Sequence, residues 1–200
     1  MDFSPENTTS EYLDLPLGEF LDLVASGNPA PGGGSVAAVA VALAAGLSGM
    51  AARLSAGQLT DGLAERADAA RLRVATLARI DAESYGRVLD AYREPDSETR
   101  RERVSDALSG ASDVPLAVAE VGNEVAGIAA RLVEEGNTNL VGDAITAVLL
   151  AEAGVRAAVT LAEINLSAAN LDDDRLGRAN ELVDETASTA RRITGGHRRG

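Results

Sequence analysis

The chain has 200 residues, of which 18 are basic and 31 acidic, and its formal net charge is −13. This length fits one domain, and the acidic charge argues against binding to nucleic acid or to an anionic membrane. Cysteine is absent and the one histidine is His197 in the tail, so disulfides, thiolate chemistry, His-based triads and Cys/His metal sites are excluded. We expect one domain over residues 1–200, without metal or cofactor and with flexible ends at 1–11 and 195–200.

All 18 basic residues are arginine. An acidic chain without lysine has two explanations, and the sequence leaves both open. Hydrated carboxylates keep a halophilic protein soluble in high salt. Alternatively, a GC-rich genome encodes arginine in place of lysine.

The first predicted helix begins at Pro16, because a proline fits the first turn of a helix. Leu17, Phe20, Leu21 and Val24 then share one face. The polar segment before this helix lacks the basic and apolar regions of a secretory signal. We therefore expect a cytoplasmic protein.

A stiff, glycine-rich loop follows, with the sequence PAPGGGS over residues 29–35. Its glycines leave backbone N–H groups uncovered, and Ser35 is placed to cap the next helix. Free N–H groups at a helix N-terminus bind anions. This predicts a substrate-binding loop made of Pro31, Gly32, Gly33, Gly34 and Ser35. The alternative is a tight turn before a capped helix.

The next predicted helix spans residues 35–55 and carries no charge from Val36 to Ala52. Its many Ala and Gly residues make it less apolar than a membrane span of about 20 residues requires. We interpret it as a helix buried on all sides in a bundle. Such a helix in a chain of this size favours a homodimer, because a partner can supply the missing cover.

The third predicted helix spans residues 63–93 and contains Asp81 and Tyr85, which are four residues apart and share a face. If partly buried, a carboxylate beside a phenol can transfer protons, because burial moves its pKa toward the working pH. The alternative is a solvated aspartate on the polar face of the helix. We keep Asp81 as the candidate catalytic residue and Tyr85 as a candidate binding residue.

Further helices are expected over residues 97–114, 115–135, 143–166 and 173–193, with Pro115 at the start of the second of these. No segment shows the alternation of a β-strand. The sequence therefore predicts an all-α, up-and-down bundle.

Polar residues at two places in these helices are further candidates. Asn139 and Asp143 follow Asn137 in the segment GNTNLVGD and can project together from a helix start, although a simple C-cap and turn explains the same pattern. Asn165 lies in an apolar setting and needs hydrogen-bond partners if it is buried.

Taken in order, these segments resemble the cyclodeaminase/cyclohydrolase family. This family comprises the C-terminal domain of formiminotransferase-cyclodeaminase and the stand-alone methenyltetrahydrofolate cyclohydrolases. The similarity runs from about Leu13 to Ile193 and rests on SGNPAPGGGS at 26–35, the small-residue helix to 55, DAESY at 81–85 with Pro95, VPL at 114–116, GNTNLVGD at 136–143 and INL at 164–166.

The resemblance implies an all-helical dimer that acts on a folate derivative. Such enzymes hydrolyse 5,10-methenyltetrahydrofolate to the 10-formyl form, or they close 5-formiminotetrahydrofolate with loss of ammonia. It points to Asp81 as the catalytic residue, and to Asn137, Asn139 and Asp143 as residues that bind the pterin or line the site. We favour the cyclohydrolase, with the cyclodeaminase and a non-catalytic helical dimer as alternatives.

One segment departs from the family. Relatives commonly carry a lysine-rich stretch that ends in an aromatic residue after the small-residue helix, whereas residues 55–61 read SAGQLTD here. If that stretch contacts folate, Arg53 or Arg66 is the candidate replacement.

Overall fold

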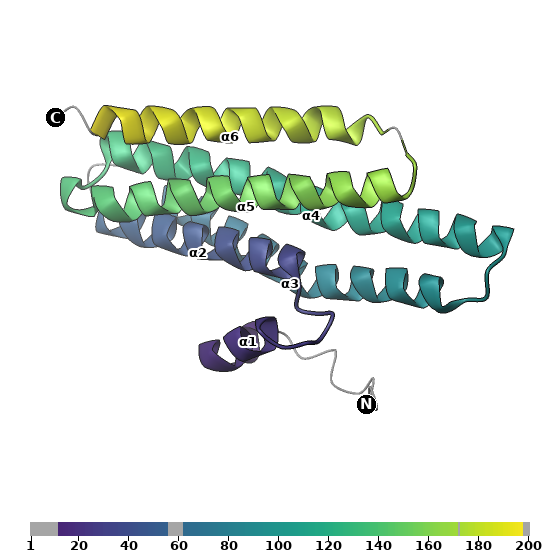
Figure 1. Ribbon diagram of the computed structural model, residues 1–200. Helices are drawn as coiled ribbons and strands as arrows, with labels where there is room; N and C mark the ends of the chain where they lie inside the picture. Colours follow the sequence, from purple (N-terminus) through teal and green to yellow (C-terminus); the bar gives the residue numbers. More distant parts are fainter. Residues whose placement is uncertain (1–11, 56–61, 172, 198–200) are drawn as a thin grey trace.

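The computed structural model describes residues 12–55, 62–171 and 173–197, and over these ranges it contains helices and turns but no strand (Figure 1). The helices are α1 (Leu17–Val24), α2 (Gly33–Leu54), α3 (Leu63–Arg93), α4 (Glu98–Glu135), α5 (Val141–Ala168) and α6 (Arg175–His197), with short 3-10 turns at Tyr12–Asp14 and Thr138–Leu140. The prediction of an all-helical bundle is confirmed.

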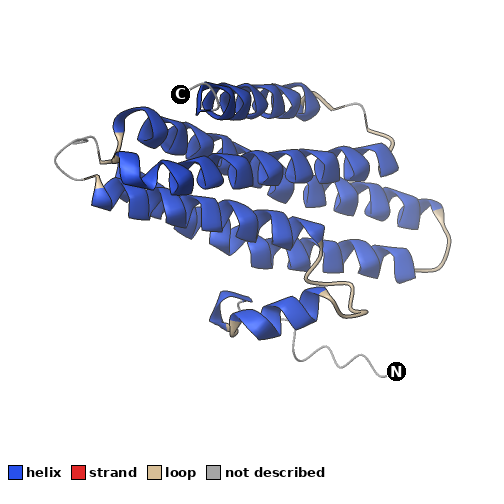
Figure 2. Ribbon diagram, turned by 60° about the vertical axis from the view of Figure 1, so that its left-hand side comes forward, coloured by secondary structure: helices blue, strands red, loops and turns tan. Residues whose placement is uncertain are grey.

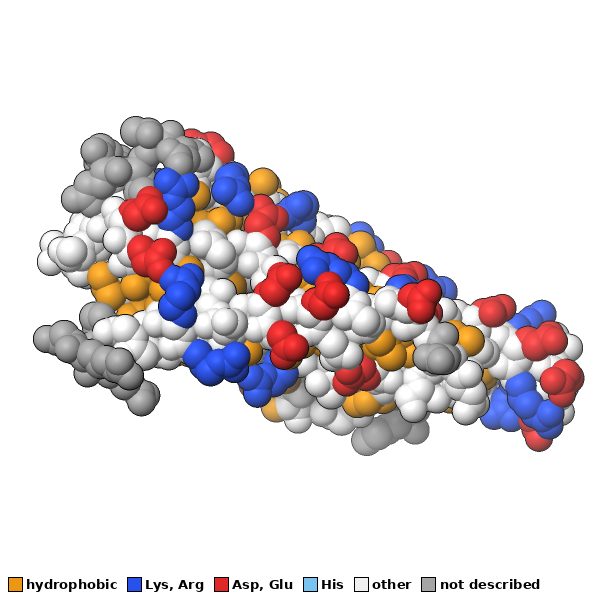
Figure 3. All heavy atoms as spheres, turned by 90° about the horizontal axis from the view of Figure 1, so that it is seen from above, with side chains coloured by type: hydrophobic (Ala, Val, Ile, Leu, Met, Phe, Trp, Pro, Cys, Tyr) orange, Lys and Arg blue, Asp and Glu red, His pale blue; other side chains and the backbone are white. Residues whose placement is uncertain are grey.

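Helices α2 to α6 form the bundle, while α1 lies outside it beside the N-terminal end of α2 (Figure 1, Figure 2). Helix α4 packs against α2, α3, α5 and α6, so it has more helical neighbours than any other helix described. Along α6 the surface carries interspersed Arg and acidic side chains (Figure 3). The charged side chains of α6 therefore lie on the surface of the bundle, and its interior is apolar.

Small residues bring the central helices close together. A side chain on Gly154 of α5 would place its Cβ 2.5 Å from Val41 Cγ2, and one on Gly122 of α4 would lie 2.5 Å from Val155 Cγ2. Both distances are shorter than van der Waals contact allows, so α2, α4 and α5 can meet at Val41 only because glycine stands at these positions.

Helix α2 is not buried on all sides in a single chain, which corrects the sequence prediction. It packs against α3, α4 and α5, and its fourth side exposes large apolar side chains such as Leu43. Helix α2 and the segment Thr138–Ala168 are long and apolar enough to cross a membrane by composition. However, each helix packs into the bundle along much of its length, as core helices do.

Residues 98–135 form one continuous helix, whereas the sequence predicted a break before Pro115. A proline inside a helix removes the N–H that would reach the carbonyl four residues earlier. Here that carbonyl belongs to Ala111, and the side-chain Nδ2 of Asn165 donates to it at 3.5 Å. A donor from a neighbouring helix thus replaces the missing backbone donor, and the helix continues.

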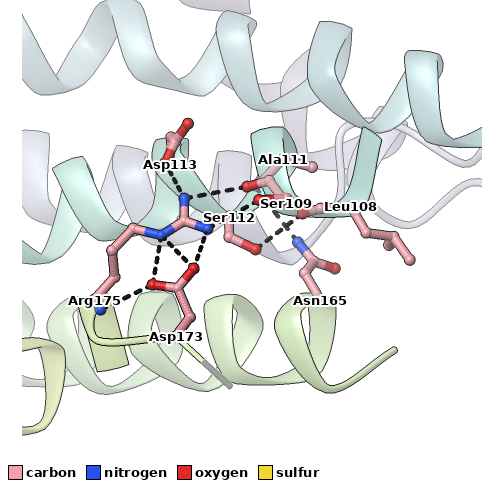
Figure 4. A network of polar contacts seen from close by, with 8 residues as sticks. All are labelled: Leu108, Ser109, Ala111, Ser112, Asp113, Asn165, Asp173 and Arg175. Carbon is pink, nitrogen blue, oxygen red and sulfur yellow. Dashed lines mark hydrogen bonds and ion pairs between the residues drawn. The ribbon is translucent and has the colours of Figure 1, made fainter. Parts of the chain in front are cut away.

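The start of α6 is fixed to α4 by Arg175 (Figure 4). Its guanidinium forms ion pairs with Asp173 and Asp113 and donates to Ser109 Oγ at 2.9 Å. Asp173 Oδ1 also accepts from the Arg175 backbone N–H at 2.9 Å. This bond satisfies one of the N–H groups that lack a partner inside the helix at its first turn.

The flexibility predicted for the two ends of the chain stays a prediction. Helix α6 reaches His197, so it includes residues 195–197. Residues 1–11 and 198–200 lie outside the described part of the chain, as do 56–61, where the sequence departs from the family.

Candidate active site

The glycine-rich loop leads directly into α2. The helix starts earlier than predicted: Gly32 is the N-cap, and Gly33 and Gly34 form the first turn. Ser35 is therefore inside the helix and is not the cap. Its side chain points to α3, where Ser35 Oγ donates to the Ala78 carbonyl at 2.8 Å.

Asp81 of α3 lies against this first turn. A Cβ on Gly34 would overlap with Asp81 Oδ1, so no residue other than glycine fits between the helix and the carboxyl group. Ser35 Oγ is 3.2 Å from Asp81 Oδ2. The glycine loop and the carboxyl group, which the sequence placed on separate helices, thus meet in one chain.

The surroundings of Asp81 change its proton affinity. Burial raises its pKa above the usual value of 3.8, while hydrogen bonds from the Ser35 side chain and backbone lower it in part. The raised pKa brings the carboxyl group closer to the pH at which it can both accept and release a proton.

A cavity of about 320 Å³ opens beside Asp81, within the range of small-molecule sites. Of the predicted site residues, Gly32, Gly33, Gly34, Asp81, Tyr85 and Asn165 line it. Ser35 does not line the cavity, because it is fully buried beneath Asp81. Pro31 is also buried and does not line it. The binding role predicted for these two residues therefore has no support from the cavity lining and stays a prediction.

The rest of the wall is mainly apolar and comes from α3, α4 and α5. Pro115 and Leu161 contribute apolar surface, and Tyr85 contributes a ring that is 44% exposed. Asn165 is the amide on this wall, and its Nδ2 is directed to the Ala111 carbonyl. A flat, largely apolar molecule with a few polar atoms suits such a lining.

Tyr12 is a neighbour of this site that the sequence analysis missed. Burial and the charge of Asp81 raise its pKa above the usual value of 10.0. Its ring lies 6.0 Å from that of Phe20 on α1. The only available signal was an aromatic residue, rare in this chain, standing just before the first helix.

The three residues predicted from the GNTNLVGD segment do not meet Asp81 in one chain. Asn137 lies at the opposite end of α2, where its N–H donates to Ser55 Oγ at 2.8 Å and its Nδ2 donates to the Leu54 carbonyl at 3.2 Å. Asn139 and Asp143 follow at the same corner. Because a helix rises about 1.5 Å per residue, α2 separates this corner from Gly33 by about 30 Å.

The two arginines considered as replacements for the lysine-rich stretch lie toward the same distant end. Arg53 pairs with Asp68, and Arg66 Nη2 is 3.9 Å from Glu124 Oε1. Neither arginine lines the cavity beside Asp81 in one chain.

The arrangement around Asp81 supports proton transfer next to a bound small molecule. The first N–H groups of a helix have no partner within it, so the start of α2 offers donors to an oxygen or anion. Asp81 offers a carboxyl group with a raised pKa. Over residues 12–55, 62–171 and 173–197, no cluster of three His, Cys, Asp or Glu side chains is arranged to hold a metal ion.

Comparison with known proteins identifies relatives over most of the chain. The profile of the formiminotransferase-cyclodeaminase family matches residues 16–185. The chain is 33% identical over 192 residues to methenyltetrahydrofolate cyclohydrolase of Methylorubrum extorquens, covering 87% of this chain and 91% of that protein. It is 29% identical over 212 residues to formimidoyltransferase-cyclodeaminase of Rattus norvegicus, covering 97% of this chain but only 38% of the rat protein.

A solved structure shows the same fold. The crystal structure of formiminotetrahydrofolate cyclodeaminase from Thermotoga maritima superposes with a TM-score of 0.79 and 28% sequence identity. The match covers 93% of this chain and 98% of that one.

Proposed function

Because the chain belongs to the formiminotransferase-cyclodeaminase family, we propose that it hydrolyses 5,10-methenyltetrahydrofolate to 10-formyltetrahydrofolate. The observation that carries this proposal is the Asp81 carboxyl group, held against Gly34 at the edge of a cavity with its pKa raised by burial. The relative from Methylorubrum extorquens, which matches over nearly its whole length, carries the name of this activity.

The reaction needs a base but no redox step. The carbon between N5 and N10 of the substrate is part of a cationic amidinium and is already electrophilic. Asp81 accepts a proton from water as the water oxygen bonds to this carbon. The bond from the carbon to N5 then breaks as the new hydroxyl group gives up its proton and becomes the formyl C=O. N5 takes up a proton, and the formyl group stays on N10. One water molecule is consumed and one proton is released overall.

The protein contributes position and polarity to this chemistry. The ionised form of Asp81 also attracts the cationic substrate carbon. The N–H groups at the start of α2 receive an oxygen of the folate, and the apolar wall accepts the flat pterin. Since the substrate supplies the electrophile, we propose that the reaction needs neither a metal nor a cofactor.

The second candidate is the cyclodeaminase reaction, which joins the same carbon to N10 and expels ammonia from 5-formiminotetrahydrofolate. The close structural match to the Thermotoga maritima cyclodeaminase favours it. We place it second because the cyclohydrolase relative is 33% identical to this chain, whereas the rat and Thermotoga maritima cyclodeaminases are 29% and 28% identical.

One assay of the purified chain separates these candidates. The cyclohydrolase is expected to remove the absorbance of 5,10-methenyltetrahydrofolate, while the cyclodeaminase would release ammonia from 5-formiminotetrahydrofolate. Runs in low and molar salt also test for a halophilic enzyme. A chain that turns over neither folate, and whose melting temperature neither folate raises, is a non-catalytic helical dimer instead.

We also propose that the enzyme is a homodimer. The uncovered side of α2 supports this, because a 22-residue apolar helix that faces water along one side is stabilised when a second chain covers it.

A further inference from the structure

The exposed side of α2 has the pattern of a helix-pairing seam. Its outward positions alternate in steps of three and four residues, which is the spacing at which one helix packs along another. Leu43 lies at the middle of this seam and is 59% exposed. The members of the seam are Gly33, Val36, Ala40, Leu43, Leu47, Met50 and Leu54.

The distribution of charge favours a second copy of this chain as the partner that packs on the seam. Each chain has a net charge of −13, so two copies repel each other over most of their surfaces. Helix α2 carries no acidic residue, and its one charged residue is Arg53 near its end. Two copies can therefore approach here with the least repulsion.

The neighbouring helix widens this surface. Leu149, Ala153 and Ile164 of α5 are exposed. A groove of about 590 Å³ runs between Gly33 and the α5 segment around Ala153 and Thr160, and the two charged residues that line it, Glu152 and Arg156, form an ion pair with each other. A face two helices wide and about 33 Å long covers about 650 Å². This is close to the roughly 800 Å² that each partner buries in a standard interface.

In an antiparallel arrangement, with a two-fold axis perpendicular to α2, the second copy brings a defined set of residues to the cavity. A two-fold axis at Leu43 lies ten residues from Gly33 and eleven from Leu54, so it places the start of one α2 beside the end of the other. The end of α2 carries Asn137, whose amide donates to the Leu54 carbonyl. An antiparallel pair thus brings the corner of the second chain to the cavity of the first.

We propose that a second copy packs antiparallel on the seam and that its Asn139 closes the cavity over Asp81, so that each active site contains residues of both chains. Asn139 is exposed, and its side-chain amide makes no hydrogen bond to any other residue that the structure describes. A shared site explains why two polar motifs lie about 30 Å apart in one chain. It relies on the proposed function only for the reaction used in the last test below.

The first test uses cysteine crosslinking, which is clean because the chain has no cysteine. With Leu43 on the axis, position 36 of one chain faces position 50 of the other. Chains carrying Val36→Cys mixed with chains carrying Met50→Cys are expected to join through a short thiol crosslinker, and Leu43→Cys is expected to join to itself. Leu72→Cys is the control, because Leu72 is 60% exposed on α3 and off the seam.

The outcomes of this test are decisive and need no substrate. Efficient joining of Val36→Cys to itself would indicate parallel helices and overturn the proposal. Joining of Leu43→Cys no faster than that of Leu72→Cys would also overturn it. As a second measurement, Leu43→Asp is expected to reduce the mass in solution from a dimer to the 20.5 kDa of one chain, with helicity unchanged.

The last test asks whether the site is shared. The Asp81→Asn and Asn139→Ala chains are co-expressed with different tags, and the mixed dimer is purified through both. Each mixed dimer holds one site with Asp81 and Asn139 intact, so it is expected to regain about half of the wild-type turnover of 5,10-methenyltetrahydrofolate. Asn139→Ala alone is expected to lower kcat/KM by about tenfold or more, because a hydrogen bond to a charged or polar substrate group is lost.

The failures of the two proposals are distinguishable. A mixed dimer no more active than its parents, or an unaffected Asn139→Ala enzyme, overturns the shared site while wild-type activity upholds the proposed function. A wild-type chain that turns over no folate overturns the proposed function, and the crosslinks then decide the antiparallel pairing alone.

Discussion

The two ends of α2 use the same residue types differently. At the distant end, Ser55, Asn137 and Asn139 bind one another: the Ser55 hydroxyl accepts the Asn137 N–H, and Asn137 Oδ1 accepts the Asn139 N–H at 3.0 Å. At the cavity end, the glycines make room for Asp81, whose carboxyl group is buried beside an open cavity.

The contrast distinguishes two polar corners. The polar groups at the distant end of α2 stabilise a turn, whereas those at the cavity end place a carboxyl group where it can transfer a proton. At the distant end the hydrogen bonds satisfy groups within the turn. At the cavity end, burial disfavours the charged state of one carboxyl group. Glycine, serine and asparagine alone do not distinguish the two corners; the buried carboxylate does.

The largest expected effect comes from removing the charge at the cavity end. Asp81→Asn keeps the size of the side chain but cannot accept a proton from water. Turnover of 5,10-methenyltetrahydrofolate is expected to fall by about 10²–10⁴-fold, the usual loss for a general base. Steady-state kinetics measure this directly, and an unchanged kcat would remove Asp81 from the mechanism.

A smaller loss is expected when the carboxyl group is displaced but not removed. Gly34→Ala introduces a methyl group that overlaps with Asp81 Oδ1 and forces the carboxyl group to move. A displacement of about 1 Å can cost about 10²-fold in rate. Gly127→Ala is the matched control, since nothing lies within 4 Å of its added Cβ. Equal kinetics for the two variants would show that this contact is not needed.

The two serines test the contrast between the ends of α2. Ser35→Ala removes a hydrogen bond that lowers the pKa of Asp81, so this pKa rises further. Activity requires ionised Asp81 and is lost as the pH falls through its pKa. The acid limb of the pH profile is therefore expected to move to higher pH in Ser35→Ala.

Ser55→Ala acts on stability instead. It leaves the Asn137 N–H without its partner at a partly buried position, which is expected to cost about 1–3 kcal/mol in the free energy of unfolding. Denaturant unfolding measures this loss. A shifted acid limb in Ser55→Ala, with none in Ser35→Ala, would reverse the roles given to the two ends.

The smallest expected effect is a gain in stability at the cavity end. The pKa of Asp81 is higher in the folded chain than its unfolded value of 3.8. The contribution of Asp81 to the free energy of unfolding is therefore greatest below pH 3.8 and is lost as the pH rises through the folded pKa. The amide that replaces the carboxyl group in Asp81→Asn cannot ionise and avoids this loss. The melting temperature of Asp81→Asn is expected to exceed that of the wild type near pH 7 and to match it below pH 3.8.

Sequence reasoning worked where local signals agree. Helix α3 was predicted as 63–93 and spans Leu63–Arg93, because a glycine precedes it and Pro95 follows it. It failed at Pro115, where the compensating donor, Asn165, comes from another helix far along the chain. No local pattern predicts such a donor.

The site was predictable in its parts but not in its assembly. The glycine loop and Asp81 were both identified, and their contact follows from the way α2 packs on α3. Ser35 was taken for a cap because capping rules consider only the neighbouring backbone, whereas its hydroxyl reaches Ala78 on α3. The separation of Asn139 from Asp81 depends on the full length of α2, which no single motif contains.

The Ser35 hydroxyl has one hydrogen and two acceptors within reach, the Ala78 carbonyl at 2.8 Å and Asp81 Oδ2 at 3.2 Å. When Asp81 is ionised, this hydrogen can turn toward the carboxylate. When Asp81 gains a proton, its own O–H can donate to Ser35 Oγ, and the serine hydrogen returns to Ala78. A rotation of one bond thus keeps the Ser35 hydroxyl hydrogen-bonded to Asp81 on both sides of a proton transfer, so the carboxyl group can change charge without losing this partner.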